Sequence, residues 1–200
     1  MANRRRVGTV KRDTRETRIA LKLGLDERKP RTTVATTIPF FDHMLTLLAA
    51  HGGLALTLKA SGDTEVDDHH LVEDVGICLG QALTKALGDK AGIRRYGDAT
   101  VPMDEALVQA VLDLSGRAHL SYGLNPSAKK VKTFDVALVR EFFEGLTREG
   151  RLTLHLRQLS RGGNAHHEIE AAFKAVGRAL GEAVGLRPGV RDIMSTKGRL

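Results

Sequence analysis

The feature that most constrains this chain is an internal duplication. The segment DDHHLVEDVG, residues 67–76, places two adjacent histidines ahead of a glutamate, and NAHHEIEAAF, residues 164–173, repeats that spacing. Ahead of these segments, residues 52–58 and 150–156 share the pattern G-x-L-x-L-x-L, whose strict alternation indicates a half-buried strand. A chain that contains the same strand-and-helix unit twice is expected to fold as two similar halves.

Each half is predicted to contain two strands, a helix, a third strand and a second helix. In the first half the early segments are ETRIALKLGLD, RTTVATTI and the helical FFDHMLTLLAAHGG, which ends at glycine, a common helix terminator. Their counterparts in the second half are DEALVQAVLDLSG, RAHLSYGLN and REFFEGLTREG. We therefore expect a first repeat over residues 1–93 and a second over residues 94–200, which includes a C-terminal tail. The expected fold class is α+β, with two tandem pseudo-symmetric βα repeats forming two layers and helices on one face of largely antiparallel sheets.

Composition narrows the class of protein. With 200 residues, of which 42% are hydrophobic, the chain can bury a core without disulfides. Its single cysteine, Cys78, excludes a Cys-rich zinc site and fits a cytoplasmic protein. No apolar run is long enough for a membrane span. The formal charge of +7 suits an anionic partner, but an aromatic content of 4% is low for a surface that stacks bases.

The duplicated histidines and glutamates form a candidate metal-binding set. Adjacent side chains on a helix are about 100° apart, so the two histidines of a pair more naturally serve two ions or two sites. His43 lies nine residues before Gly52 and Glu141 lies nine before Gly150, so these two positions are equivalent. The eight candidate ligands are His43, His69, His70, Glu73, Glu141, His166, His167 and Glu170. Imidazole and carboxylate without thiolate suit Mn²⁺, Fe²⁺ or Zn²⁺, and six-coordination of two ions favours Mn²⁺.

Several cations outside this set are candidate phosphate contacts. Lys174 lies four residues beyond Glu170 on the same helical face, so it is expected to point toward the metal-binding set. The tail segment STKG, residues 195–198, offers a hydroxyl and an ammonium group. Together with the cations of the turns, these groups could bind phosphate beside the metal ions. The candidates are Arg95, Arg117, Lys174, Ser195 and Lys197.

These motifs together resemble the imidazoleglycerol-phosphate dehydratase family. The resemblance is carried by RDTRET at residues 12–17, FFDHM at residues 40–44, DDHHLVEDVG, RRYGDATVPMDEAL, DLSGRAHL, LTLHLRQL, NAHHEIEAAFKA and STKG. They occur in the family's order along almost the whole chain. There are two departures: many relatives have His where this chain has Glu141, and many have D-Q-L where it has Thr46-Leu47-Leu48. The loop SRGGN also carries one extra residue, which should alter only that loop.

The resemblance implies dehydration of imidazoleglycerol phosphate to imidazole acetol phosphate in histidine biosynthesis, through a metal-stabilised imidazolate and two Mn²⁺ ions per site. It implies that the histidines and glutamates of the candidate set bind the ions, with Glu141 a departure among them, and that the five phosphate candidates contact the substrate. Glu16 matches an active-site carboxylate, and Glu16, Glu73 and Glu170 are all candidates for the catalytic base. The resemblance also implies a homo-oligomer of about 24 subunits in which neighbouring subunits complete each site.

Two other functions remain compatible with the residues alone. A dinuclear metallohydrolase of a small phosphorylated substrate would use the same ligands to activate water and would release inorganic phosphate. A basic RNA-associated protein would bind RNA in a salt-dependent manner without metal. RNA binding gives no reason to duplicate the His-His-x-x-Glu motif, so we expect no nucleic-acid partner.

Overall fold

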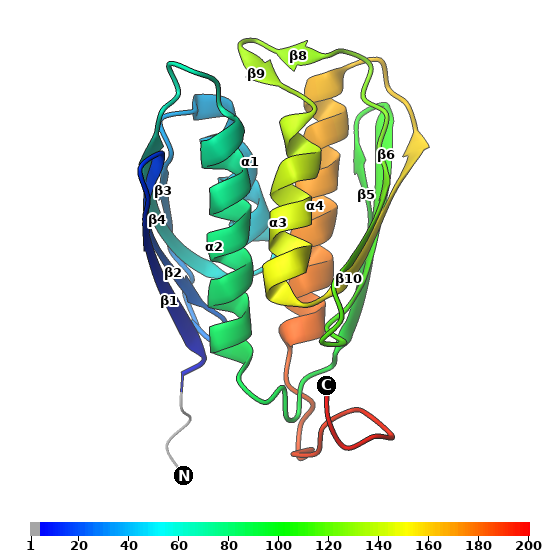
Figure 1. Ribbon diagram of the computed structural model, residues 1–200. Helices are drawn as coiled ribbons and strands as arrows, with labels where there is room; N and C mark the ends of the chain where they lie inside the picture. The colour runs from blue at the N-terminus through cyan, green and yellow to red at the C-terminus, as the bar shows by residue number, and fades with distance from the viewer. Residues whose placement is uncertain (1–4) are drawn as a thin grey trace.

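The computed structural model describes residues 5–200, and each half of the chain forms a four-stranded sheet with two helices on one of its faces (Figure 1). The first half contains β1 (Val7–Asp13), β2 (Thr17–Gly24), β3 (Thr32–Ala35), α1 (Pro39–His51), β4 (Ala55–Gly62) and α2 (His69–Leu87). The second half contains β5 (Tyr96–Met103), β6 (Ala106–Asp113), β7 (His119–Gly123), α3 (Leu138–Gly150), β10 (Thr153–Ser160) and α4 (Ala165–Val184), with a short hairpin of β8 (Lys130–Val131) and β9 (Phe134–Asp135) ahead of α3.

The two sheets have the same topology. Their strand orders are β1-β2-β4-β3 and β5-β6-β10-β7, which place corresponding strands at corresponding positions. In each sheet one edge pair, β3 with β4 or β7 with β10, is parallel, and the other pairs are antiparallel. The predicted α+β fold of two similar βα repeats with largely antiparallel sheets is therefore confirmed.

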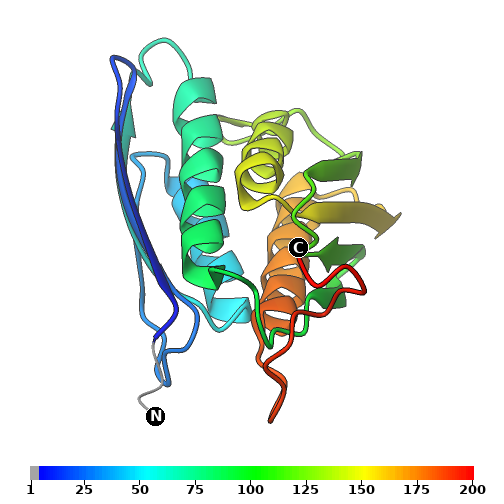
Figure 2. The same cartoon turned by 60° about the horizontal axis from the view of Figure 1, so that its bottom comes forward.

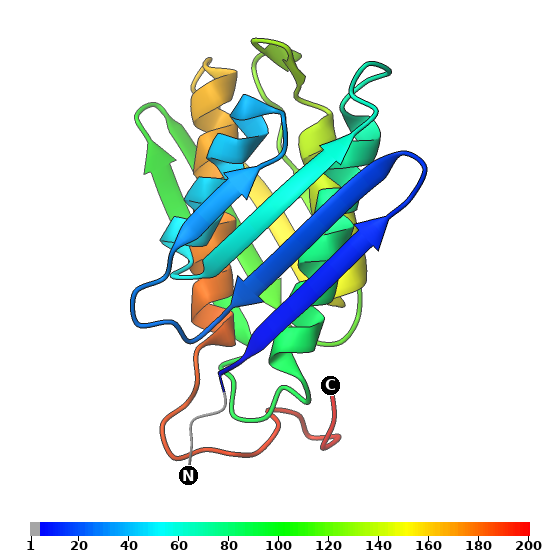
Figure 3. The same ribbon diagram turned by 90° about the vertical axis from the view of Figure 1, so that its left-hand side faces the viewer.

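Alternating hydrophobic residues explain which face of each sheet is buried. In β2, the side chains of Ile19, Leu21 and Leu23 point into the core, while Arg18 and Lys22 face solvent. Figure 3 shows the outer face of this first sheet with the helices behind it. Each sheet packs against helices with one face only, so the polar side chains on its other face remain exposed to solvent.

The two halves pack against each other through their helices. Helix α2 lies against α3, and α1 lies against α4, so the sheets form the two outer layers (Figure 1). Glycines permit these crossings: a Cβ atom at Gly80 would lie 2.6 Å from the Gly150 nitrogen, and one at Gly177 would overlap the Leu48 carbonyl oxygen. The crossings hold the starts of helices from opposite halves close together.

Three elements were not predicted from the sequence. Strands β1 and β5 precede the strands that were expected to come first, and the β8–β9 hairpin lies in a segment expected to be irregular. Strand β1 lies beside basic residues that obscure its alternation, and β5 contains Gly97 and Pro102, which disfavour strands. The predicted boundary after residue 93 lies in the loop between α2 and β5, and residues 1–4 of the predicted first repeat lie outside the described residues. Within residues 5–200, no helix is long and apolar enough to cross a membrane.

Candidate functional site

All four long helices begin at the same end of the molecule, at the top of Figure 1. Side chains just ahead of the two histidine pairs bind the first amides of the helices. The Asp67 carboxylate accepts a hydrogen bond from the His69 amide at 2.8 Å, and the side-chain oxygen of Asn164, the N-cap of α4, accepts one from the His166 amide at 3.0 Å. The partial positive charge of helix N-termini favours carboxylates at this end. The fold thus gathers imidazole and carboxylate side chains from both halves.

The first ligand cluster combines α1 with α4. The ligand atoms of His43, His166 and Glu170 all lie within 4.8 Å of one another. The Glu170 carboxylate lies 3.5 Å from His43 Nε2 and 3.2 Å from His166 Nε2. Because one ligand comes from the first half and two come from the second, the contact between the halves is part of this cluster.

Lys174 supports the carboxylate of the first cluster. Its Nζ lies 2.6 Å from Glu170 Oε1, one helical turn along α4. Burial alone would raise the pKa of Glu170, but the hydrogen bond and charge of Lys174, together with His43, lower it below its ordinary value. Glu170 is therefore held as a carboxylate, the form that binds metal ions.

Within residues 5–200, the predicted ligands at the starts of α2 and α3 are not gathered into a comparable cluster. His69 Nε2 lies 3.9 Å from the Glu73 carboxylate, and the Arg148 guanidinium donates to that carboxylate at 3.1 Å. Glu141 lies in the first turn of α3, the position that corresponds to His43 in α1. Among the described residues, the groups of three closely spaced ligand atoms include none of His69, His70, Glu73 and Glu141. The roles of these four residues as ligands remain predictions.

The second histidine of each pair makes a different contact from the first. The Nδ1 atom of His70 lies 3.1 Å from the Asp63 carboxylate and 4.0 Å from Glu16, and this hydrogen bond to Asp63 raises the pKa of His70. The Nδ1 atom of His167 lies 3.0 Å from the Glu105 carboxylate. A carboxylate on Nδ1 fixes the ring and leaves Nε2 available as a metal ligand.

Glu105 was missed by the sequence interpretation. It occupies the turn before β6, as Glu16 occupies the turn before β2, so the two carboxylates are equivalent in the duplicated fold. With Asp104 it approaches His167 closely enough to form a possible cation site. Aligning the two hairpins would have revealed this pair, but β1 and β5 had to be recognised first.

The predicted phosphate-binding residues divide into two groups. Four of them line one cavity of about 430 Å³: Arg95, Arg117, Ser195 and Lys197. Arg95 is held by the Asp113 carboxylate at 2.7 and 3.0 Å, and it donates to the Met194 carbonyl at 2.6 Å, which holds the tail against the cavity. Lys174 is not in this group, because it lies beside Glu170 in the first ligand cluster.

The cationic cavity and the ligand clusters lie at opposite ends of the molecule. Figure 2 brings forward the end that carries the tail and the loop between α2 and β5. Helix α4 has His166 in its first turn, and the tail follows its other end at Val184. A helix of this length spans about 30 Å at 1.5 Å per residue. A small molecule cannot contact both groups within one chain.

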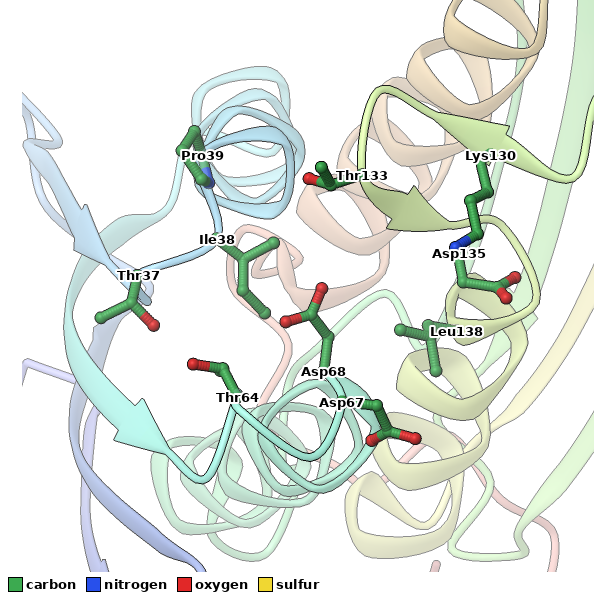
Figure 4. A pocket seen from close by; sticks show the side chains of 10 residues that line it. All are labelled: Thr37, Ile38, Pro39, Thr64, Asp67, Asp68, Lys130, Thr133, Asp135 and Leu138. Atoms are coloured by element: carbon green, nitrogen blue, oxygen red, sulfur yellow. The ribbon is translucent and has the colours of Figure 1, made fainter.

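A further cavity of about 470 Å³ lies between the starts of α1, α2 and α3 (Figure 4). The Asp68 carboxylate points into it, and burial together with the charge of Asp67 raises the pKa of Asp68. Its other lining residues include Thr37, Ile38 and Leu138, but none of the predicted site residues. This cavity separates the two halves at the ligand end rather than joining the predicted ligands.

Comparison with known proteins agrees with the duplicated sequence. Residues 36–180 match the family model for imidazoleglycerol-phosphate dehydratase. The chain is 52% identical to the imidazoleglycerol-phosphate dehydratase of Streptococcus mutans, over 98% of this chain and 100% of that protein. It is 54% identical to the enzyme of the same name from Desulforamulus reducens, over 98% of each.

Two solved structures share the fold. The crystal structure of imidazoleglycerol-phosphate dehydratase from Staphylococcus aureus has a TM-score of 0.79 and 41% identity, covering 90% of this chain and 99% of that chain. The Pyrococcus furiosus structure, in complex with (S)-C348, has a TM-score of 0.82 and 38% identity, covering 96% of this chain and 100% of that chain. On the match of the family model and of relatives over nearly its whole length, this chain belongs to the imidazoleglycerol-phosphate dehydratase family.

Proposed function

We infer that this chain is a hydro-lyase that converts imidazoleglycerol phosphate to imidazole acetol phosphate in histidine biosynthesis. The observation that carries the inference is the cross-half cluster of His43, His166 and Glu170 in a member of this family. The reaction removes a hydroxyl from the carbon attached to the imidazole ring and a proton from the adjacent carbon. The resulting enol then rearranges to the ketone.

We propose that the site takes two Mn²⁺ ions. The fit rests on the donor set: the first cluster offers two imidazoles and a carboxylate, and Cys78 is buried with its pKa raised to about 11 by that burial. His69 and Glu73 would hold the second ion, with Glu141 as a further ligand from α3. The free Nε2 atoms of His70 and His167 would complete the two coordination spheres. Bound ions would polarise the imidazole ring of the substrate and help it carry negative charge.

We propose that each site is shared between copies of the chain in a homo-oligomer of about 24 subunits. The support is the length of α4, which separates the ligand clusters from the cationic cavity. The substrate has only a three-carbon chain between ring and phosphate, so its ring must be bound by one copy and its phosphate by another. Arg95, Arg117, Ser195 and Lys197 would bind the phosphate.

Among the three candidate bases, the contacts favour Glu16. The Glu170 carboxylate is engaged by Lys174 and two imidazoles, and the Glu73 carboxylate is engaged by Arg148 and His69. Glu16 has a side chain that is 57% exposed and lies 4.0 Å from His70. A substrate bound beside His70 could therefore reach it directly, so we assign proton removal to Glu16 and ligand roles to the other two.

The reaction is tested with the assembled, Mn²⁺-loaded protein. Imidazole acetol phosphate should form without release of inorganic phosphate, whereas a metallohydrolase would release phosphate and form no ketone. We further propose a cytoplasmic location, which the single buried cysteine supports because the chain needs no disulfide.

Sharing of the site is tested by mixing two inactive variants. His43→Ala should disable the ligand end, and Lys197→Ala should disable the phosphate end. When the two are dissociated and reassembled together, random mixing should place both intact ends at about one site in four. Activity that stays absent after confirmed reassembly would show that one chain supplies both ends. Reassembly of each variant alone provides the control.

A further inference from the structure

A buried lysine lies behind the cationic cavity. Lys90, in the loop between α2 and β5, is only 7% exposed, and its ammonium donates to the Leu114 carbonyl at 3.0 Å. Burial lowers the pKa of Lys90, and the nearby charge of Arg151 lowers it further. The charge of Asp113 acts in the opposite direction on the pKa of Lys90, but within residues 5–200 the hydrogen bond found for its ammonium is the one to Leu114. Its direct partner is therefore a backbone carbonyl rather than a carboxylate.

The carbonyl that Lys90 contacts belongs to the segment that carries the cavity. The Leu114 amide donates to the Arg95 carbonyl at 3.0 Å, which links Lys90 to one phosphate candidate. Three residues farther on is Arg117, whose amide donates to the Ser115 hydroxyl at 3.3 Å. A shift of Leu114 would therefore move the backbone of Arg95 and of Arg117 together.

Positive charge exceeds negative charge around this segment. Arg151 donates to the Gly116 carbonyl at 3.3 Å, which adds a cation beside Lys90, Arg95 and Arg117. Two carboxylates lie at this segment: that of Asp113, both of whose oxygens bind Arg95, and the C-terminal carboxylate of Leu200, which lies against Gly116. A buried ammonium whose direct partner is a carbonyl is stabilised further when an anion lies nearby. A phosphate dianion in the adjacent cavity would supply that compensation.

We propose that Lys90 is a positioning residue for phosphate binding: it fixes Leu114, thereby orients Arg95 and Arg117, and leaves a buried positive charge for a phosphate dianion to balance. This inference rests on the proposed role of the cavity. It differs from a purely structural role, because a structural lysine would stabilise the protein equally with and without phosphate.

The test replaces Lys90 with methionine in the assembled, Mn²⁺-loaded protein. Loss of the contact and of the charge should raise KM for imidazoleglycerol phosphate and the inhibition constant of inorganic phosphate by about 10- to 100-fold. The kcat value should change little, because Lys90 does not touch the reacting atoms. The rise in melting temperature caused by inorganic phosphate should shrink, while the melting temperature without phosphate should change little.

Lys85→Met is the matched control. Lys85 also donates to a backbone carbonyl, that of Thr9 at 3.2 Å, but it is exposed and does not line the cavity. It should leave phosphate binding unchanged.

Lys90→Arg retains the charge, so it should recover most of the phosphate affinity. It also serves as the test variant if Lys90→Met does not assemble. A phosphate affinity of Lys90→Arg far below that of Lys85→Met would contradict the role of charge.

Two outcomes separate this inference from the proposed function. If Lys90→Met lowers the melting temperature but binds phosphate as well as the parent protein, Lys90 is only structural and the inference is wrong. If the parent protein itself is not stabilised by phosphate and does not turn over the substrate, the proposed phosphate cavity fails instead. A fall in kcat with unchanged KM would also overturn the positioning role.

Discussion

At the scale of single residues, the two ring nitrogens distinguish histidines that the sequence leaves equivalent. His69 and His166 direct Nε2 toward a glutamate on their own helix, whereas His70 and His167 direct Nδ1 toward carboxylates from other elements. Adjacent imidazoles therefore make separate contacts within one helical turn. This arrangement supports the expectation that each pair serves two ions.

Substitution of Glu16 tests the proposed base. Glu16→Gln removes the proton acceptor and retains the shape, so kcat should fall by about 10²- to 10⁴-fold. Metal content and melting temperature should remain unchanged, because the Glu16 side chain is exposed and its carboxylate makes no contact with the first ligand cluster. Glu65→Gln is the control, since Glu65 is an exposed neighbour that borders the same hollow. An active Glu16→Gln variant would return the role to Glu73 or Glu170.

The ion pair of Arg6 and Asp26 gives a pH-dependent prediction away from the site. Arg6 binds both Asp26 oxygens at 2.6–3.2 Å and also donates to the Val184 carbonyl at 2.7 Å. The Arg6 hydrogen bond lowers the pKa of Asp26 in the folded protein, although burial opposes it. The stabilisation is therefore complete above the pKa of the unfolded carboxyl and is lost as pH falls through the folded pKa.

Asp26→Asn should reduce the free energy of unfolding at neutral pH by about 1.5–3 kcal/mol. The difference from the parent protein should shrink in acid, because the parent loses the same interaction there. The difference in free energy of unfolding is measured by urea unfolding of both proteins, at neutral pH and at pH values below the pKa range of carboxyl groups. A difference independent of pH would mean that the charge of Asp26 is not the cause.

Residue-scale predictability was uneven for a physical reason. Repetition of His-His-x-x-Glu identifies potential ligands, because spacing along a helix follows directly from sequence. The hydrogen bonds of His167 with Glu105 and of His70 with Asp63 depend on how strands approach helices. Spacing along the chain carries no information about such contacts. Lys174 is a second example: the sequence predicted which helical face it lies on, but not that it lies far from Arg95.

At the scale of elements, the helix crossings fix the distance between ligands of opposite halves. Gly177 faces the backbone of α1, where an added Cβ would overlap the Leu48 carbonyl oxygen. Backbone atoms cannot move aside as a side chain can. The α1–α4 distance, and with it the first ligand cluster, therefore depends on this glycine.

Gly177→Ala should destabilise the protein by about 1–3 kcal/mol through overpacking and should weaken metal binding as α1 shifts. Gly24→Ala is the control, because an added Cβ there would meet its nearest atoms at 3.5 Å, an ordinary contact. Melting temperature and bound metal per chain measure the two effects. Equal behaviour of the two variants would contradict the importance of the close crossing.

Elements with strong periodicity were predicted, and those with mixed signals were not. The alternating run of β4 and the long apolar faces of α2 and α4 gave clear patterns, so these elements appear where expected. Strand β5 alternates in burial as regularly as β2, but Asp98 and Pro102 on its exposed face conceal the pattern. Pairing with β6 along its length overrides those local preferences.

At the scale of the whole molecule, the proposed sharing of sites between copies predicts that metal binding and oligomer assembly depend on each other. If His70 and His167 complete ion sites of neighbouring copies, each ion joins two chains. Removing metal with a chelator should therefore yield smaller particles, and adding Mn²⁺ should restore the large one. Light scattering measures both states. A particle whose mass does not change on metal removal would show that the ions bind within single chains.

The placement of ligands and cations at opposite ends of α4 also governs when activity can begin. If each site is shared as proposed, a newly made chain would carry two partial sites and no complete one, and it would be inert until it met other copies. Below the concentration for assembly, the rate should rise more steeply than the amount of protein, and specific activity should fall on dilution. The reaction would then begin only above a threshold concentration of the enzyme, and this threshold would follow from the length of one helix.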